Sequence, residues 1–260
     1  MKFRYIVAAL LFLALISCKR TEKVEYFKDG SISKKTVYTT PDKSSYRETH
    51  FYDGERVKGL HEFTDGIQNG RSFNYYPNGE IQSVFYYNMG KLTSIARYFD
   101  QNGRLTDKGL FINDSLVVKE EFYYTGNLTE VSVFAKNNGE FSESGSLLVN
   151  SKGYAGLDNS FYYTVHSLDS IPLGDSIRIN VNFIARKKGS MRLVLTLGSL
   201  DENLQFLTKD KTYMSDSMAI SFYYKSRKKD YNLLTGKLRY VDHVTNKTDE
   251  FVFFHDFLVY

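Results

Sequence analysis

The chain has 260 residues, of which 25% are charged and 42% are hydrophobic, and its formal net charge is +4. That balance gives no support for a nucleic-acid-binding protein, which needs a basic face on a suitable fold. The length is enough for two domains that each bury a core. Aromatic residues are abundant, with 21 Tyr and 20 Phe but no Trp, and a single Cys leaves no partner for an internal disulfide.

The first 17 residues have the pattern of a bacterial signal peptide. Lys2 and Arg4 give a positive start, and an apolar run of 12 residues follows at 5–16, which is too short to span a bilayer. The next residues, Leu15-Ile16-Ser17-Cys18, resemble the lipobox of bacterial lipoproteins. The resemblance implies that residues 1–17 are removed, that the Cys18 thiol receives diacylglycerol, and that the new amine is acylated, for example with palmitate.

A lipid-anchored protein of the bacterial cell envelope is therefore expected, in the outer membrane of a Gram-negative bacterium. Two or more acyl chains hold a protein stably on a bilayer. Residues 18–23 form a short charged tether, so the first folded strands should begin close to the membrane. Removal of Lys2 and Arg4 leaves a net charge of +2. Periplasmic and surface-facing orientations both stay open.

A short aromatic phrase that closes on a turn glycine repeats through the middle of the chain. Gly79 and Gly103 lie 24 positions apart, Gly103 and Gly126 lie 23 apart, and Gly90 falls near the middle of the first interval. Aromatic residues favour strands, and Asn-Gly or Asp-Gly supplies the positive φ of a tight hairpin. Each repeat therefore predicts two strands and two turns. Because one hairpin is marginal in water, the repeats should stack into a curved or twisted meander.

Residues 62–105 resemble the bacterial MORN-variant repeat, in which an aromatic pair, an Asx-Gly turn and an aliphatic residue precede a second aromatic half. The phrases that carry the resemblance are 75–83, 87–92 and 98–105. The match weakens over 106–139, where Asn113-Asp114-Ser115 replaces a glycine turn, and it is faint over 24–54. The family implies a β-hairpin array with a binding or scaffolding role and no catalytic residues. Its members often carry an antitoxin-like label.

The predicted repeat domain spans residues 24–150. Within it the pattern is diluted over 31–48, which predicts a long hairpin or an inserted loop, and the regular array runs over 50–141. Gly and Ser residues around 142–153 mark the domain boundary.

The second predicted domain spans residues 155–260 and has lost the repeat. Ile177, Ile179, Val181 and Phe183 alternate with polar residues, as in a half-buried strand. Strands are also predicted at 161–168, 190–197, 218–224, 233–241 and 250–259, with a weaker one at 204–208. Six or seven short strands in this length predict an antiparallel β-sandwich of the immunoglobulin-like type. The expected fold class is thus all-β, a hairpin meander followed by a sandwich.

No pattern of catalytic, cofactor-binding or metal-binding residues is visible, so we expect no enzyme, no cofactor and no metal. The sequence lacks a nucleophile elbow, a phosphate-binding loop and a dinucleotide fingerprint. An enzyme would need a cleft between the two domains with converging ionisable groups. None of the histidines has metal-ligand spacing, which favours structural or surface roles for His50, His61, His166, His243 and His255.

Three binding functions fit these observations. The first is a non-enzymatic, membrane-anchored module that binds or scaffolds an unknown envelope protein. The second, suggested by the label of the repeat family, is an antitoxin or immunity protein. The third is a glycan-binding surface lipoprotein that uses exposed Tyr rings, although such sites rely heavily on Trp and the chain has none.

Overall fold

The computed structural model describes residues 21–53, 56–122, 128–137, 140–148, 162–184, 191–226, 228–244, 246 and 248–260. Within these ranges every regular element is a β-strand, so the predicted all-β fold class is confirmed. The strands are β1 (Glu22–Tyr26), β2 (Ile32–Tyr38), β3 (Tyr46–Phe51), β4 (Val57–Thr64), β5 (Ile67–Tyr75), β6 (Ile81–Asn88), β7 (Lys91–Phe99), β8 (Leu105–Ile112), β9 (Ser115–Phe122), β10 (Leu128–Asn137), β11 (Glu140–Leu148), β12 (Tyr162–His166), β13 (Ser170–Ile171), β14 (Ser176–Ile184), β15 (Met191–Leu197), β16 (Lys211–Ser215), β17 (Ala219–Lys225), β18 (Asp230–Asp242) and β19 (Thr248–Val259).

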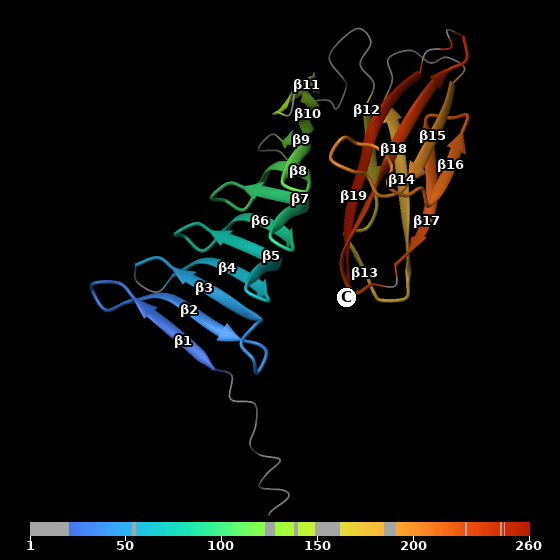
Figure 1. Cartoon of the computed structure of the whole chain (residues 1–260). Helices are drawn as coiled ribbons and strands as arrows, with labels where there is room; N and C mark the ends of the chain where they lie inside the picture. Colours follow the sequence, from blue (N-terminus) through green and yellow to red (C-terminus); the bar gives the residue numbers. More distant parts are fainter. Residues whose placement is uncertain are drawn as a thin grey trace, which may run out of the picture. The chain divides into compact units, whose positions relative to one another are not determined.

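The chain forms two compact units, Met1–Gly90 and Lys91–Tyr260. In unit 1, strands β1 to β6 follow one another as an antiparallel meander (Figure 1). Unit 2 contains the meander strands β7 to β11 and a β-sandwich. The first part of the predicted boundary at 142–153 belongs to β11, so residues 142–148 form a strand and not a linker. The rest of that boundary and the predicted signal and lipid-attachment residues at 1–18 lie outside the described residues.

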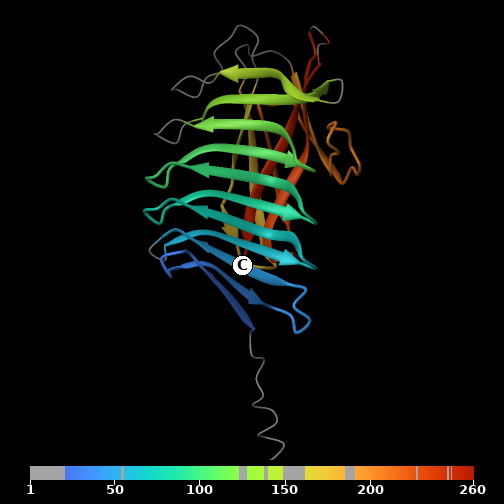
Figure 2. The ribbon, with the colours of Figure 1, turned by 60° about the vertical axis from the view of Figure 1, so that its left-hand side comes forward.

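Within each unit the turns of the meander alternate between the two ends of the strands (Figure 2). At one end of the strands the turns have two residues, both with positive φ, as type I′ hairpins require. Asp65-Gly66 and Met89-Gly90 supply two of these turns, and Asn113-Asp114 supplies a third with φ values of 48° and 70°. The Asn-Asp pair thus makes the turn for which the repeat pattern predicts glycine, because short polar side chains tolerate this conformation.

At the other end of the strands the turns are longer and contain the repeat glycines. Gly79 has a φ of 93° and donates its backbone N–H to the Tyr76 carbonyl, while Tyr76 N–H reaches the Glu80 carbonyl at 2.8 Å. Gly103 makes the equivalent bond to Asp100, and Gly30 makes it to Phe27. Each of these turns follows a shift in strand register. The spacing of these glycines in the sequence therefore marks the longer turns, which lie at one end of the strands.

The meander begins earlier than the regular array at 50–141 suggested. Residues 31–48 form a hairpin of β2 and β3, closed around Pro41-Asp42 by a bond from Thr39 N–H to the Ser45 carbonyl, and β1 pairs with β2. The hairpin alternative for this stretch is therefore correct. Its polar side chains are mostly only partly exposed in the sheet, and Thr36 of β2 is buried.

The end of unit 2 is a sandwich of two sheets with strand orders β12-β14-β17 and β13-β19-β18-β15-β16. The chain crosses from the first sheet to the second between β14 and β15 and returns between β16 and β17, as in immunoglobulin-like folds. Aromatic rings join the two layers: Phe183 stacks on Tyr240 at 5.1 Å between ring centroids, and Tyr213 stacks on Phe222 at 4.3 Å.

The sandwich differs from the sequence expectation at three short segments. β13 and β16 were not expected, since β13 has two residues and β16 is an exposed, polar edge strand. The weak strand predicted at 204–208 is wrong: Phe206 makes an isolated bridge to Leu200 across a turn. The Asp201 carboxylate accepts hydrogen bonds from the backbone N–H groups of Asn203 and Gln205. These bonds close a loop, where a strand would pair with a neighbouring strand.

Burial is distributed unequally between the units. Every fully buried hydrophobic side chain among the described residues belongs to unit 2, from Ile95 to Val259. In residues 21–53 and 56–90 the buried positions are Thr36, Gly59, Ser72 and Ser83. Unit 1 is therefore a sheet whose apolar side chains are only partly covered, whereas unit 2 has an apolar core.

Candidate functional site

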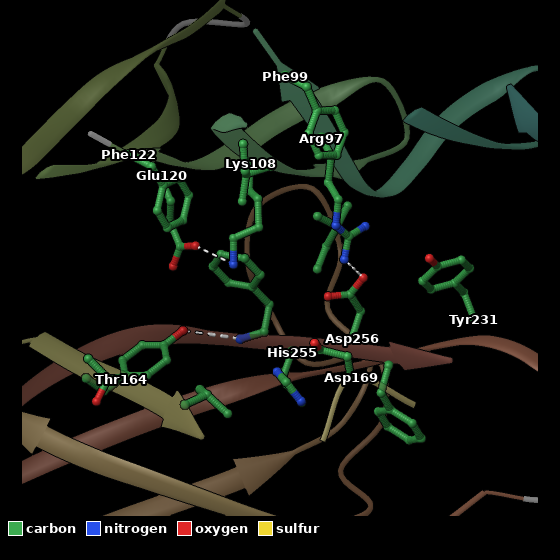
Figure 3. A pocket seen from close by; sticks show the side chains of 16 residues that line it. Arg97, Phe99, Lys108, Glu120, Phe122, Thr164, Asp169, Tyr231, His255 and Asp256 are labelled. Atoms are coloured by element: carbon green, nitrogen blue, oxygen red, sulfur yellow. Dashed lines mark hydrogen bonds and ion pairs between the residues drawn. The ribbon is translucent and has the colours of Figure 1, made fainter. Parts of the chain in front are cut away.

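A cavity of about 600 Å³ lies within unit 2, between the meander strands β7 to β9 and the edge of the sandwich (Figure 3). Alternate residues of β7 point into it, because successive side chains of a strand face opposite sides. Arg97 is paired in register with Lys108 on β8, and Lys108 is paired with Glu120 on β9. Three neighbouring strands thus place two cations and a carboxylate in one row on the cavity wall.

The facing wall comes from the sandwich. β19 contributes Asp256 and His255, β18 contributes Tyr231, and Asp169 stands in the segment before β13. Figure 3 shows Arg97, Lys108 and Glu120 extending from one wall towards Asp256 and His255 on the other. The remaining lining side chains are mainly apolar or aromatic: Ile95, Phe99, Leu105, Phe122, Tyr163, Thr164, Val165, Phe254 and Phe257.

Four charged groups of the cavity form two pairs. The Arg97 guanidinium donates a hydrogen bond to the Asp256 carboxylate, which joins the two walls, and Lys108 Nζ lies 2.7 Å from Glu120 Oε2. Glu120 is only 8% exposed. Burial lowers the pKa of Arg97 from its usual value, although an arginine this basic stays protonated. Removing one partner of such a pair would leave an uncompensated, poorly hydrated charge.

Both cations also contact aromatic rings. Lys108 Nζ lies 5.4 Å from the ring centroid of Phe122 and 5.9 Å from that of Phe254, and the Arg97 guanidinium lies 5.7 Å from that of Tyr231. At these distances the cation is attracted to the negative face of the ring. The rings thereby hold the two long side chains across the cavity and limit their motion.

His255 is the one histidine that reaches this cavity among the described residues. Its Nε2 lies 2.7 Å from Ser167 Oγ, and its pKa is lowered to about 4, first by burial and then by the charge of Lys108. Arg97 lowers the pKa further, while Asp169 and Glu120 act in the opposite direction. The imidazole is consequently neutral at pH 7.

The Ser167–His255 contact does not have the polarity of a catalytic pair. Ser167 Oγ also donates to the Leu168 carbonyl at 3.1 Å, so both contacts are satisfied when His255 Nε2–H donates to Ser167. A general base must instead accept the serine proton, and a pKa of about 4 makes a weak base at pH 7. The ionisable groups converge as an enzyme would require, but their pairing and protonation do not match acid–base catalysis.

A second Ser–His contact lies in unit 1. His61 Nδ1 is 2.5 Å from Ser72 Oγ, and the His61 ring meets that of His50 edge to face at 5.2 Å. His50 Nε2 in turn lies 3.0 Å from Glu48. Burial lowers the pKa of His61, with a smaller contribution from His50. Because Ser72 is only 2% exposed, this cluster has no reactive hydroxyl at the surface and stabilises the sheet.

Little in the sequence indicates the cavity. Arg97 and Asp256 are 159 positions apart, and Ser167 and His255 are 88 apart. One signal was present: Arg97 and Phe99, like Glu120 and Phe122, are separated by two positions, which places a charge and a ring on the same face of a strand. Partner strands so distant in the chain cannot be paired by spacing alone.

Cys18, the one site residue predicted from the sequence, lies outside the described residues. Among the residues that the structure covers, no group of three or more His, Cys, Asp or Glu side chains has the geometry to hold a metal ion. The same part of the chain contains no helix long and apolar enough to cross a membrane.

Comparison with known proteins does not assign the chain to a family. No known family model matches the chain, and no curated protein is significantly similar to it in sequence. The lipobox and MORN-variant resemblances accordingly stay predictions made from the residues.

Proposed function

We propose that the chain is a non-enzymatic, lipid-anchored protein of the bacterial envelope that binds or scaffolds another envelope protein through unit 1. The observation that carries the proposal is the absence of any fully buried hydrophobic side chain in residues 21–53 and 56–90. A six-stranded sheet of Tyr, Phe, Leu and Val with partly covered faces is a surface suited to a partner.

The face that we assign to the partner is centred on an apolar row. Leu60, Phe73 and Val84 are paired in register on β4, β5 and β6, so their side chains share one side of the sheet. Next to this row a hollow of about 410 Å³ is lined by Val57, Leu60 and Tyr75, with Arg56 and the 77–79 turn at its rim. An aromatic or aliphatic anchor residue of a partner fits such a hollow.

The non-enzymatic part of the proposal is supported by the cavity of unit 2. Its four inner charges form the pairs Arg97–Asp256 and Lys108–Glu120, and His255 is neutral at pH 7. A pocket for proton transfer needs a group whose pKa is near the working pH and whose proton is free to move.

The anchor is proposed from Cys18. Metabolic labelling with palmitate should label the wild-type chain, and Cys18→Ala should lose the label and leave the membrane fraction. Cys18→Ala keeps residues 21–260 unchanged, so its loss from membranes would report the anchor and not the fold. An unlabelled wild-type chain would contradict the lipid anchor without bearing on the unit 1 surface.

The partner surface is tested by site-specific photo-crosslinking in intact cells. A benzoyl-phenylalanine at position 73 should give one discrete, abundant cross-linked product after irradiation. The matched control is the same group at position 223, where Tyr223 is 66% exposed on β17 of unit 2. No product from position 73, or the same products from both positions, would contradict the assignment.

A further inference from the structure

The cavity of unit 2 combines balanced charge with unused hydrogen-bonding capacity. Arg97 and Lys108 are offset by Asp256 and Glu120, so the inner wall carries no net formal charge. Asp169 adds one carboxylate at the exposed rim. A ligand with a full charge would therefore find its counter-charge in the cavity already paired, with Arg97 on Asp256 and Lys108 on Glu120.

The hydrogen-bond donors of the row are only partly used. A guanidinium has five N–H donors and an ammonium has three. Among the described residues, Arg97 makes one side-chain hydrogen bond, to Asp256, and Lys108 makes one close polar contact, to Glu120. No fully buried side-chain nitrogen or oxygen in the described part of the chain lacks a partner. The Arg97 side-chain nitrogens that make no hydrogen bond are therefore not fully buried.

The acceptors are similarly available. A carboxylate has about four lone-pair positions, and Asp256 uses one of its oxygens on Arg97. Asp169 makes no side-chain hydrogen bond with another described residue. The cavity thus offers donors from one wall and acceptors from the other, at positions that Figure 3 shows facing each other.

Aromatic rings complete the lining. Phe99, Phe122, Tyr231 and Phe254 all border the cavity, and Tyr231 is 39% exposed, so its ring lies at the entrance. The face of an aromatic ring is negative and attracts positively polarised C–H groups. A suitable ligand consequently has C–H-rich faces as well as hydroxyl groups that both donate and accept.

We propose that this cavity binds a neutral carbohydrate of one or two sugar rings. Its hydroxyl groups accept hydrogen bonds from Arg97 and Lys108 and donate to Asp256 and Asp169, while a ring face stacks on Tyr231. The volume of about 600 Å³ is within the usual range for small-ligand sites. The site is separate from the unit 1 surface and from Cys18, so it can fail or hold independently of the proposed function.

The test is ligand-observed NMR and calorimetry on the full chain in a detergent without sugar groups. The probes are glucose, galactose, mannose, N-acetylglucosamine, maltose and cellobiose, with glucuronic acid and glucosamine as charged counterparts. We expect at least one neutral sugar to bind with a Kd below about 1 mM. Neither charged counterpart of the bound sugar should bind more tightly.

Variants place the binding in the cavity. Tyr231→Ala removes an entrance ring without breaking either ion pair and should weaken sugar affinity at least tenfold. Tyr223→Ala, which removes an exposed ring that does not border the cavity, should leave affinity unchanged. The thermal midpoints of both variants, measured without sugar, check that they fold.

Three results would overturn the proposal. The first is that none of the neutral sugars binds. The second is that glucuronic acid or glucosamine binds more tightly than every neutral sugar. The third is an equal loss of affinity in Tyr231→Ala and Tyr223→Ala, which would place any bound sugar outside this cavity.

Discussion

Units 1 and 2 use the same strand chemistry and hold it together in different ways. In unit 2, Ile95, Leu110 and Val118 of the meander belong to one buried apolar cluster with Phe253 and Phe257 of β19. In unit 1, no hydrophobic side chain of the described residues reaches that degree of burial. Burial of apolar area dominates the stability of most domains, so the two units should respond differently to the same kind of substitution.

What replaces the core in unit 1 is local chemistry. The type I′ turn at Asp65-Gly66 fixes the register of β4 and β5, the strands that it joins. Cross-strand polar contacts such as His61–Ser72, and the stacked rings of Tyr46 and Phe63 at 4.7 Å, add smaller increments. A sheet built in this way keeps its apolar side chains available, which is useful when they serve a partner.

The largest expected difference comes from truncating a phenylalanine in each unit. Phe253 is fully buried, and Phe253→Ala should lower the free energy of unfolding of unit 2 by about 3–5 kcal/mol. Phe73→Ala, at a half-buried position of unit 1, should lower it by about 1 kcal/mol. Native-state hydrogen exchange resolves the two units. Equal losses would mean that unit 1 has a core comparable to that of unit 2.

The next effect concerns ion pairs. Asp256→Asn leaves the mostly buried Arg97 without its counter-charge and should cost about 3–4 kcal/mol in urea unfolding. The control is Glu62→Gln in unit 1, which removes the exposed pair with Arg47 at 3.0 Å and should cost less than about 1 kcal/mol. A negligible effect of Asp256→Asn would show that the pair does not join the walls of the cavity.

A pH effect should follow from His255. Its pKa falls from the ordinary value of 6.5 to about 4 on folding, so between these values the unfolded chain binds a proton that the folded chain does not. Stability should be unaffected by this group above pH 6.5, and it should fall between pH 6.5 and 4 by at most about 3 kcal/mol.

His61 in unit 1 shifts in the same direction and should add to the loss. Thermal unfolding of wild type and His255→Gln across pH 4–7.5 separates the two histidines, because the variant should keep only the smaller slope. An identical pH dependence in wild type and His255→Gln would contradict the burial assigned to His255.

The smallest expected effect should be the same in both units. Gly79 in unit 1 and Gly174 in unit 2 have φ values of 93° and 96°, and an added Cβ would meet no atom within 4 Å at either position. Alanine should therefore cost only the backbone strain, about 1–2 kcal/mol in each case. A much larger loss at Gly79, measured by urea unfolding, would show that this turn alone determines the register of the meander.

The sequence predicted the elements whose pattern is local. The alternation of Ile177, Ile179 and Val181 predicted a half-buried strand, and all three side chains are fully buried in β14. Glycine spacing predicted the turns after β5 and β7. These features depend on neighbouring residues, whose conformational preferences act at short range.

The cavity could not be predicted in the same way. Arg97 and Asp256 meet only because β7 of the meander and β19 of the sandwich face each other within unit 2. That contact depends on how two sheets pack, and no spacing in the chain encodes it. β13 was also missed, because its pairing with β19 is parallel and joins residues from the start and the end of the sandwich.

Hydroxyl-radical footprinting tests most directly whether the apolar face of unit 1 is a binding surface. The rate of oxidation of Phe73 should fall several-fold in intact cell envelopes relative to the purified protein, whereas that of the exposed Tyr223 in unit 2 should be the same in both. Equal oxidation of Phe73 in envelopes and in the purified protein would mean that no partner covers unit 1, and would contradict the account.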